Sequence, residues 1–131
     1  MEEHIIIYKN DSNGKYYKVP NALMKLNLSS GEIAVYNYLL FCEDRKTFKC
    51  HPSIKTIGKA IGMSKNTVVK YIRMLEEKCF IYTDNTLVTL ESGVRRNGNL
   101  MYTIRPIEDA IKYFHDSQMS RLDSAYGRSV K

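Results

Sequence analysis

Three stretches of the chain carry apolar residues at the three- and four-residue spacing of an amphipathic helix. The first follows Ser29 or Ser30, either of which can cap it, and runs to about residue 42. The second follows Ser53, and Gly62 closes it because a left-handed C-terminal conformation costs glycine least. The third follows Ser64 and runs to about residue 78. The pattern predicts three helices, the last two joined by a short turn.

Other stretches have the β-branched and aromatic character of strands. Residues 4–9 and 15–19 flank a polar segment whose Asn-Gly pair suits a tight turn, which predicts an N-terminal hairpin. After the third helix, the predicted strands are residues 80–83, 87–90 and 100–105, with a polar bend over residues 91–99. We also expect a short helix at residues 22–26 and a solvated loop at residues 43–50.

The order of these elements is helix, helix, helix, strand, wing, strand, which predicts an α+β fold. We divide the chain into a hairpin at residues 1–20, a three-helix and wing domain at residues 21–106, and a C-terminal helix and tail at residues 107–131. In that last segment, Glu108 and Asp109 favour a helix start, and an apolar stripe follows. The stripe consists of Ala110, Ile111, Phe114, Met119 and Leu122.

The composition indicates one globular, basic domain. The 131 residues include 20 Lys and Arg against 14 Asp and Glu, a net charge of +6, and 44% are hydrophobic. The longest apolar run is far shorter than a membrane span, and the N-terminus lacks the pattern of a signal peptide. Three cysteines without paired spacing fit a reducing compartment. We therefore expect a cytoplasmic protein.

Several separated motifs resemble winged helix-turn-helix proteins. Residues 64–68 (SKNTV) with 75–78 (LEEK) look like their recognition helices. Residues 18–21, 28–36 and 50–57 are similar to a bacterial winged-helix family frequent in phages, plasmids and conjugative elements, which includes replication initiators. The resemblance covers about residues 16–83. It implies sequence-specific binding of double-stranded DNA through a recognition helix at about residues 64–78 and a basic wing, by a transcription regulator or a replication-initiation protein of a mobile element.

Basic residues concentrate where this resemblance places DNA. Residues 51–80 hold six basic and two acidic residues, whereas residues 107–131 hold four of each. The alternative is a solvated basic face. The candidate DNA-binding residues are Ser53, Lys55, Ser64, Lys65, Asn66, Thr67, Lys70, Tyr71, Arg73, Arg95 and Arg96.

Position along the predicted helix suggests a role for each candidate. Lys65 and Asn66, in its first turn, can reach base edges in the major groove, and Lys70 and Arg73 can reach a base or flanking phosphates. Hydroxyl groups near helix starts suit phosphates. Tyr71 either donates to a phosphate or packs inward. Ser53, Lys55 and Thr67 are the candidates for phosphate binding by the helices. Arg95 and Arg96 can enter a minor groove or lie along the phosphate backbone, and the alternative is that the pair forms a solubilising bend.

Three features depart from the family pattern, and one of them is a basic wing tip at residues 95–99 (RRNGN), which favours DNA binding. Cys79 stands where the family has a glycine after Glu-Glu-Lys, so the left-handed helix end expected there would be strained. Val69 stands where the family commonly has a polar or basic residue, and its methyl groups can meet only a thymine methyl.

The apolar stripe of the C-terminal helix either packs on its own domain or pairs with a second copy, and we favour a homodimer. The N-terminal hairpin is a second candidate for that contact. The main alternative to DNA binding is a protein-interaction module of a replication or conjugation complex. The sequence predicts no catalytic residue, no cofactor and no membrane partner. A zinc site at Cys42, Cys50, His51 and Cys79 matches no known finger spacing, so we predict no metal.

Overall fold

The computed structural model describes residues 16–130. The first arm and the turn of the predicted N-terminal hairpin lie outside these residues. Of its second arm, residues 16–19 belong to no helix or strand, which differs from the prediction for this part. Tyr17 instead packs its ring edge-on against Phe41 at a centroid distance of 5.9 Å. An aromatic contact therefore holds this segment where backbone pairing was expected.

The predicted helices are confirmed. They are the 3-10 helix η1 (Asn21–Lys25) and the α-helices α2 (Ser30–Cys42), α3 (Ile54–Ile61), α4 (Lys65–Glu77) and α5 (Ile107–Val130). Ser29 is the cap of α2, and its backbone N–H and hydroxyl both donate to the Glu32 carboxylate. Gly62 ends α3 at φ 73°, in the left-handed region. The serine caps and the terminal glycine thus act as the sequence indicates.

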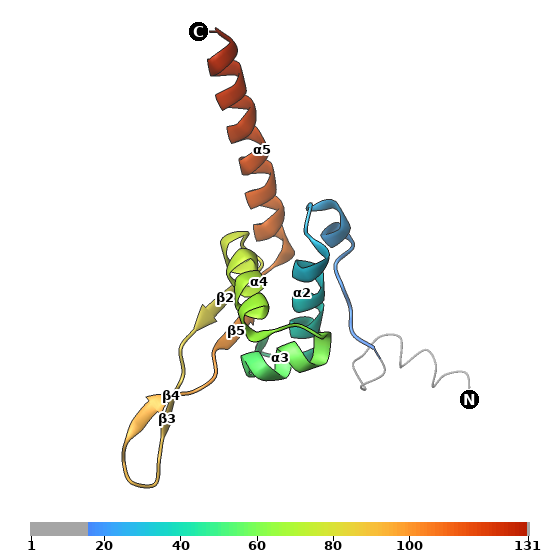
Figure 1. Ribbon diagram of the computed structural model, residues 1–131. Coiled ribbons are helices and arrows are strands. Elements are labelled where there is room, and N and C mark those ends of the chain that lie inside the picture. The colour runs from blue at the N-terminus through green and yellow to red at the C-terminus, as the bar shows by residue number, and fades with distance from the viewer. Residues whose placement is uncertain (1–15, 131) are drawn as a thin grey trace, which may run out of the picture.

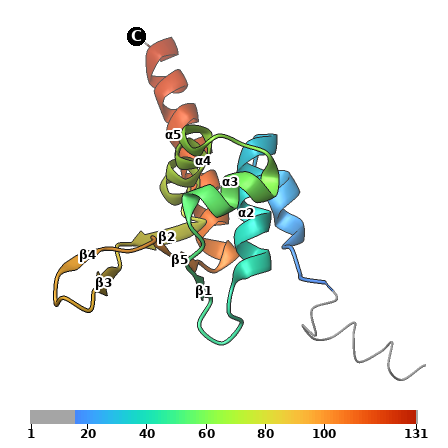
Figure 2. The same cartoon turned by 60° about the horizontal axis from the view of Figure 1, so that its bottom comes forward.

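The strands form two antiparallel ladders. A three-stranded sheet has the order β1 (Lys49–Cys50), β5 (Met101–Ile104), β2 (Ile81–Asp84), and β3 (Leu87–Thr89) pairs with β4 (Arg95–Asn97) as the wing. Figure 2 shows β1 beside β5. Two expectations were wrong. The loop at residues 43–50 contains β1 because Cys50 pairs with Tyr102 and is buried, and the bend at residues 91–99 contains β4 because Arg95 pairs with Thr89.

Residues from α2, α3, α4 and the sheet share one core, whose fully buried side chains include Tyr36, Ile57, Leu75 and Tyr102. The turn between α3 and α4 brings the backbones close together. A Cβ at Gly58 would lie 2.5 Å from the Met63 carbonyl oxygen, so only glycine fits this crossing. The helices, the small sheet and the wing form the winged helix-turn-helix architecture predicted from the sequence.

The two ends of α5 have different surroundings. Ala110 is buried, and Ile111 and Phe114 pack against the core, whereas Met119 and Leu122 are 58% and 63% exposed. In Figure 1, α5 leaves the body of the domain at one end and the β3–β4 ribbon leaves it at the other. The first part of the predicted stripe therefore packs on its own domain, and the second part faces solvent.

Candidate nucleic-acid interface

Helix α4 buries one face and exposes another. Val68, Ile72 and Leu75 lie in the core, and this fixes the rotation of the helix about its axis. The cationic and amide side chains that the sequence singled out remain on the exposed surface. They are Lys65, Asn66, Lys70 and Arg73. The first turn of α4 thus presents two polar side chains to solvent, in the position from which a recognition helix reads bases.

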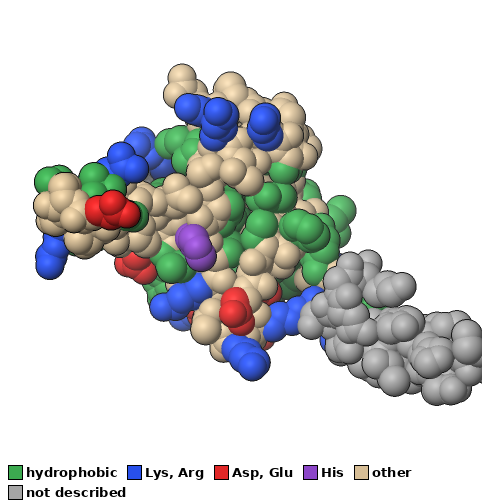
Figure 3. Space-filling view, turned by 90° about the horizontal axis from the view of Figure 1, so that it is seen from below, with side chains coloured by type: hydrophobic (Ala, Val, Ile, Leu, Met, Phe, Trp, Pro, Cys, Tyr) green, Lys and Arg blue, Asp and Glu red, His purple; other side chains and the backbone are tan. Residues whose placement is uncertain are grey.

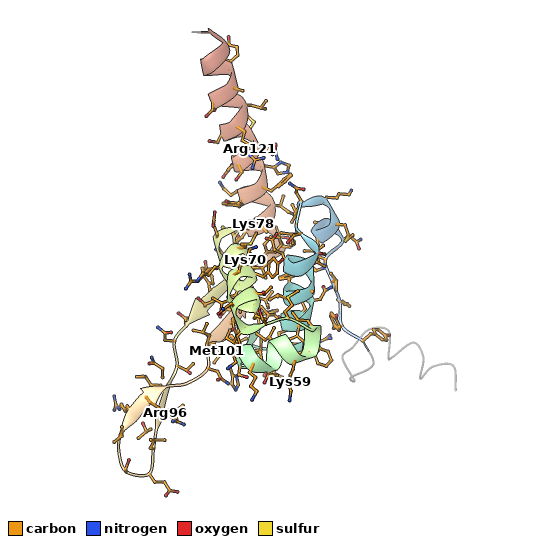
Figure 4. All side chains as sticks on the ribbon, in the orientation of Figure 1. Lys59, Lys70, Lys78, Arg96, Met101 and Arg121 are labelled. Atoms are coloured by element: carbon orange, nitrogen blue, oxygen red, sulfur yellow. The ribbon has the colours of Figure 1, made fainter. Side chains whose placement is uncertain are left out.

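Helix α3 also carries two exposed cationic side chains. Lys55 and Lys59 are exposed, while Ile57 on the same helix is fully buried. Lys59 was missing from the predicted site, although its spacing of four residues from Lys55 places both on one face. Figure 4 labels Lys59 on α3, Lys70 on α4 and Arg96 on β4. Cations of the candidate interface therefore come from three separate elements.

The predicted hydroxyl ligands act as helix caps. Ser53 Oγ accepts from the Thr56 N–H at 3.0 Å and donates to its hydroxyl at 2.8 Å. Ser64 Oγ accepts from the Thr67 N–H at 3.3 Å and lies 2.9 Å from the Thr67 hydroxyl. These hydroxyl groups therefore orient the starts of α3 and α4, and any phosphate contact would be additional.

Tyr71 lies on the inner side of α4. Its ring occupies the space beside Gly31 on α2, where an added Cβ would come within 2.3 Å of two of its ring carbons. The side chain is half-buried and packs against the core. Of the two interpretations of this residue, the packing favours the inward one.

The wing arginines lie on a strand. Arg96 pairs with Val88 and Arg95 with Thr89, and all residues of β3 and β4 are exposed. The sequence placed the arginines at a basic wing tip, which was wrong: the tip is formed by residues 91–94 and includes Glu91. Because neighbouring strand residues point to opposite faces, only one arginine of the pair can face a given side of the wing.

Lys78 ends α4 and has a partner inside the protein. Its Nζ lies 2.8 Å from Oε2 of Glu32, whose side chain is 1% exposed. Burial alone would raise the pKa of Glu32, but the hydrogen bonds from Lys78 and Ser29 outweigh it and hold this pKa below its usual value. Of the six basic residues between residues 51 and 80, Lys78 is thus part of the structural framework.

On the face seen from below, Lys and Arg side chains lie along the upper edge, on the wing at the left, and along the lower edge, where acidic side chains accompany them (Figure 3). The described residues include no group of three or more His, Cys, Asp or Glu side chains placed to hold a metal ion. Cys42, Cys50 and Cys79 are free, and burial raises the pKa of Cys50 to about 12. None of the helices between residues 16 and 130 has the length and apolar character that a membrane span requires.

A family model matches the part of the chain that contains α2, α3 and α4. Residues 26–81 match the family model of a helix-turn-helix domain. The matched segment runs from the end of η1 to the first residue of β2, and lies within the part of the chain on which the sequence resemblance rests. The matched segment therefore contains α2, α3 and α4, with the wing and α5 following it. No curated protein matches the sequence of this chain.

Solved structures share the winged fold. A possible transcriptional regulator from Methanosarcina mazei Go1 has 21% identity and a TM-score of 0.50, with 90% of this chain and 93% of that chain covered. MepR, a transcription regulator of the Staphylococcus aureus multidrug efflux pump MepA, has 16% identity and a TM-score of 0.43, with coverages of 95% and 78%. The S. aureus MepR–DNA complex has 16% identity and a TM-score of 0.43, with coverages of 99% and 92%.

Proposed function

We propose that this protein binds double-stranded DNA in a sequence-specific manner, as a transcription regulator or as a replication-initiation protein of a mobile element. One observation carries the proposal: α3, α4 and β4 all carry exposed cations, and the first turn of α4 is exposed at Lys65 and Asn66 while the opposite face of the helix is buried. Neutralising backbone phosphates requires such cations, and reading bases requires a rigidly held helix. Lys65 and Asn66 are the proposed base-reading residues.

Salt dependence tests the binding itself. If roughly 4 to 8 phosphates are neutralised, a plot of log affinity against log salt should have a slope of about −4 to −7. Fluorescence anisotropy with a labelled duplex, selected from a random pool, gives this slope. Absence of binding at low salt would refute the proposal. It would favour an interaction module of a replication or conjugation complex, for which the exposed Phe41 beside Tyr17 offers a surface.

Single substitutions separate reading from anchoring. We expect Lys65→Ala or Asn66→Ala to cost about 1–3 kcal/mol on the selected duplex and less on random DNA, because a lost base contact removes discrimination. Lys59→Ala is the control, since it removes a cation from α3 without touching the first turn of α4. Equal losses on both duplexes for Lys65 and Asn66 would mean that they contact phosphate alone.

We further propose that α5 joins two copies of the chain. Met119, Leu122 and Tyr126 recur at spacings of three and four residues and are 58%, 63% and 73% exposed. Most of the stability of a helix in a protein comes from packing of its apolar face, so burying this stripe against a second copy would stabilise the part of α5 that leaves the domain. A dimer would also present two recognition helices to paired half-sites.

Light scattering after size exclusion measures the oligomeric state directly. We expect a dimer for the unaltered chain and a monomer for Leu122→Asp. Ser120→Asp introduces the same charge away from the stripe and should leave the dimer intact. A monomer at all concentrations of the unaltered chain would refute this contact while leaving the DNA proposal open.

A further inference from the structure

A cavity of about 370 Å³ lies on the domain away from the recognition helix. Its walls come from the end of α2, the segment before β1, and the junction between β5 and α5. Most of the wall is apolar, with Leu40, Phe48, Ile104 and Ile107 among the lining residues. Its volume falls in the range of small-molecule sites in proteins, roughly 300–1,000 Å³.

One carboxylate belongs to this wall. Glu43 directly follows α2, and its Oε2 is buried without a hydrogen-bond partner among the described residues. Burial raises the pKa of Glu43, and Arg45 offsets only part of that rise. A carboxylate oxygen that has lost water and gained no donor is costly, so a donor that enters the cavity would relieve this cost.

Among the described residues, no neighbouring cation donates a hydrogen bond to that oxygen. Arg45, which offsets part of the pKa rise of Glu43, donates to the Tyr16 carbonyl at 3.5 Å. Arg105 lines the cavity, but its Nε donates to Asp109 Oδ2 at 3.1 Å and its guanidinium lies 4.2 Å from the centroid of the Tyr82 ring. Lys18 also lines the cavity, and its side chain is exposed to water. The negative charge of Glu43 is therefore available to a positively charged guest.

Phe48 adds a second sign of a built site. Its φ is 60°, a left-handed conformation that bulky residues rarely adopt. Two backbone hydrogen bonds hold it: its N–H donates to the Asp44 carbonyl at 2.6 Å, and its own carbonyl accepts from the Ile104 N–H at 2.8 Å. Strain of this kind persists where surrounding contacts enforce it, and here it accompanies an aromatic ring in the cavity wall.

From these observations we infer that the cavity binds a small organic ammonium ion, with its apolar body against Leu40, Phe48 and Ile107 and its N–H donors on the Glu43 carboxylate. The lining residues include one carboxylate, which is too few oxygen ligands for a bare metal ion. A neutral molecule would add no charge to the partial compensation that Arg45 gives Glu43. The inference concerns ligand binding alone and does not depend on the DNA proposal.

The test uses the full chain and three probes of one shape: 2-naphthylmethylammonium, 2-naphthylmethanol and 2-naphthoate. Isothermal titration calorimetry at pH 8 gives each affinity. We expect the ammonium ion to bind on the order of tenfold more tightly than the alcohol, because a charge-assisted hydrogen bond replaces a neutral one. Equal affinities for the ammonium ion and the alcohol, or tightest binding of the naphthoate, would overturn the inference.

Variants locate the binding. Glu43→Gln keeps the shape of the side chain and should reduce the preference for the ammonium ion over the alcohol to near unity. Glu91→Gln, the same change on the exposed wing tip, should preserve it. Phe48→Ala should reduce the affinities for the ammonium ion and for the alcohol by the same factor. A preference that survives Glu43→Gln would place the site elsewhere. If Glu43→Gln fails to fold, the three probes on the unaltered chain still decide the charge preference.

Discussion

The α2–α4 junction and the wing hold their side chains in place by different means. At the junction, a carboxylate that is 1% exposed joins the cap of α2 to the end of α4 through Ser29 and Lys78. In the wing, every residue of β3 and β4 is exposed, and the ribbon depends on its ladder and on polar contacts at its base, such as that from the Asn99 amide to the His51 carbonyl at 3.1 Å. Helix α4 is thus fixed by burial, whereas the arginines of the wing are held by backbone pairing and by polar contacts at the base of the ribbon.

The largest expected effect comes from breaking the junction. Lys78→Met leaves the buried Glu32 carboxylate without its cation, and we expect a loss of about 3 kcal/mol in the free energy of unfolding. Urea denaturation at pH 7 measures this loss. Lys70→Met, on the exposed side of the same helix, should change stability by less than about 0.5 kcal/mol. Similar losses for both variants would show that the ion pair contributes little.

The same junction predicts how stability depends on pH. Because the pKa of folded Glu32 is lowered, its contribution is present above the ordinary carboxyl pKa of about 4.3 and is lost as the pH falls through the lower folded value. Urea denaturation between pH 7 and pH 3 should therefore show a shallower acid loss for Glu32→Gln than for the unaltered chain. The control Glu91→Gln, on the wing, should show the same dependence of stability on pH as the unaltered chain. If Glu32→Gln also showed the same dependence as the unaltered chain, Glu32 would not contribute to the acid loss of stability.

This contrast explains which parts of the structure the sequence could predict. Helices α2, α3 and α4 have serine caps and apolar residues at regular spacing, so their bounds and their buried faces could be predicted from local pattern. The wing has no buried face, so nothing in its pattern separates strand β4 from a bend. Strand β1 is two residues long, and only its pairing with β5 defines it.

In the candidate site, too, some features could be predicted from local sequence pattern and others depend on contacts between distant residues. The exposure of Lys65 and Asn66 could be predicted because the buried stripe of α4 fixes the opposite face. The pairing of Lys78 with Glu32 could not, because it joins residues far apart in the sequence. Glu43 gave no local signal either, since the other residues that line its cavity include the junction between β5 and α5, which is far away in the sequence.

Removing the wing cations should affect DNA binding and leave stability unchanged. For the double variant Arg95→Ala with Arg96→Ala, we expect an unfolding free energy within about 0.5 kcal/mol of the unaltered chain, because both side chains are exposed. Affinity for selected and random duplexes should fall together by roughly tenfold, and the salt slope should become shallower by about 1 to 2. Anisotropy titrations at several salt concentrations measure both. A loss confined to the selected duplex would mean that the wing reads sequence.

The smallest expected effect concerns Cys79, which lies between the end of α4 and strand β2. Its φ is 69°, the left-handed helix end that the resemblance implied. Its N–H donates to the Glu76 carbonyl at 3.1 Å, and the Phe80 N–H donates to the Leu75 carbonyl at 3.0 Å, which is the hydrogen-bond pair of a Schellman helix end. Glycine is the residue that adopts this conformation without strain.

Replacing Cys79 by glycine should therefore raise stability. Relief of the left-handed strain contributes on the order of 1–2 kcal/mol, and the greater freedom of glycine in the unfolded chain removes about 0.5–1 kcal/mol of that gain. Cys79 is half-buried, so the thiol leaves only a small void. Thermal melts under reducing conditions should show a melting temperature raised by a few degrees. Asn27→Gly is the matched control at φ 59°, where asparagine already tolerates the conformation, and it should gain less. A lowered melting temperature for Cys79→Gly would mean that packing of the thiol outweighs the backbone strain behind the recognition helix.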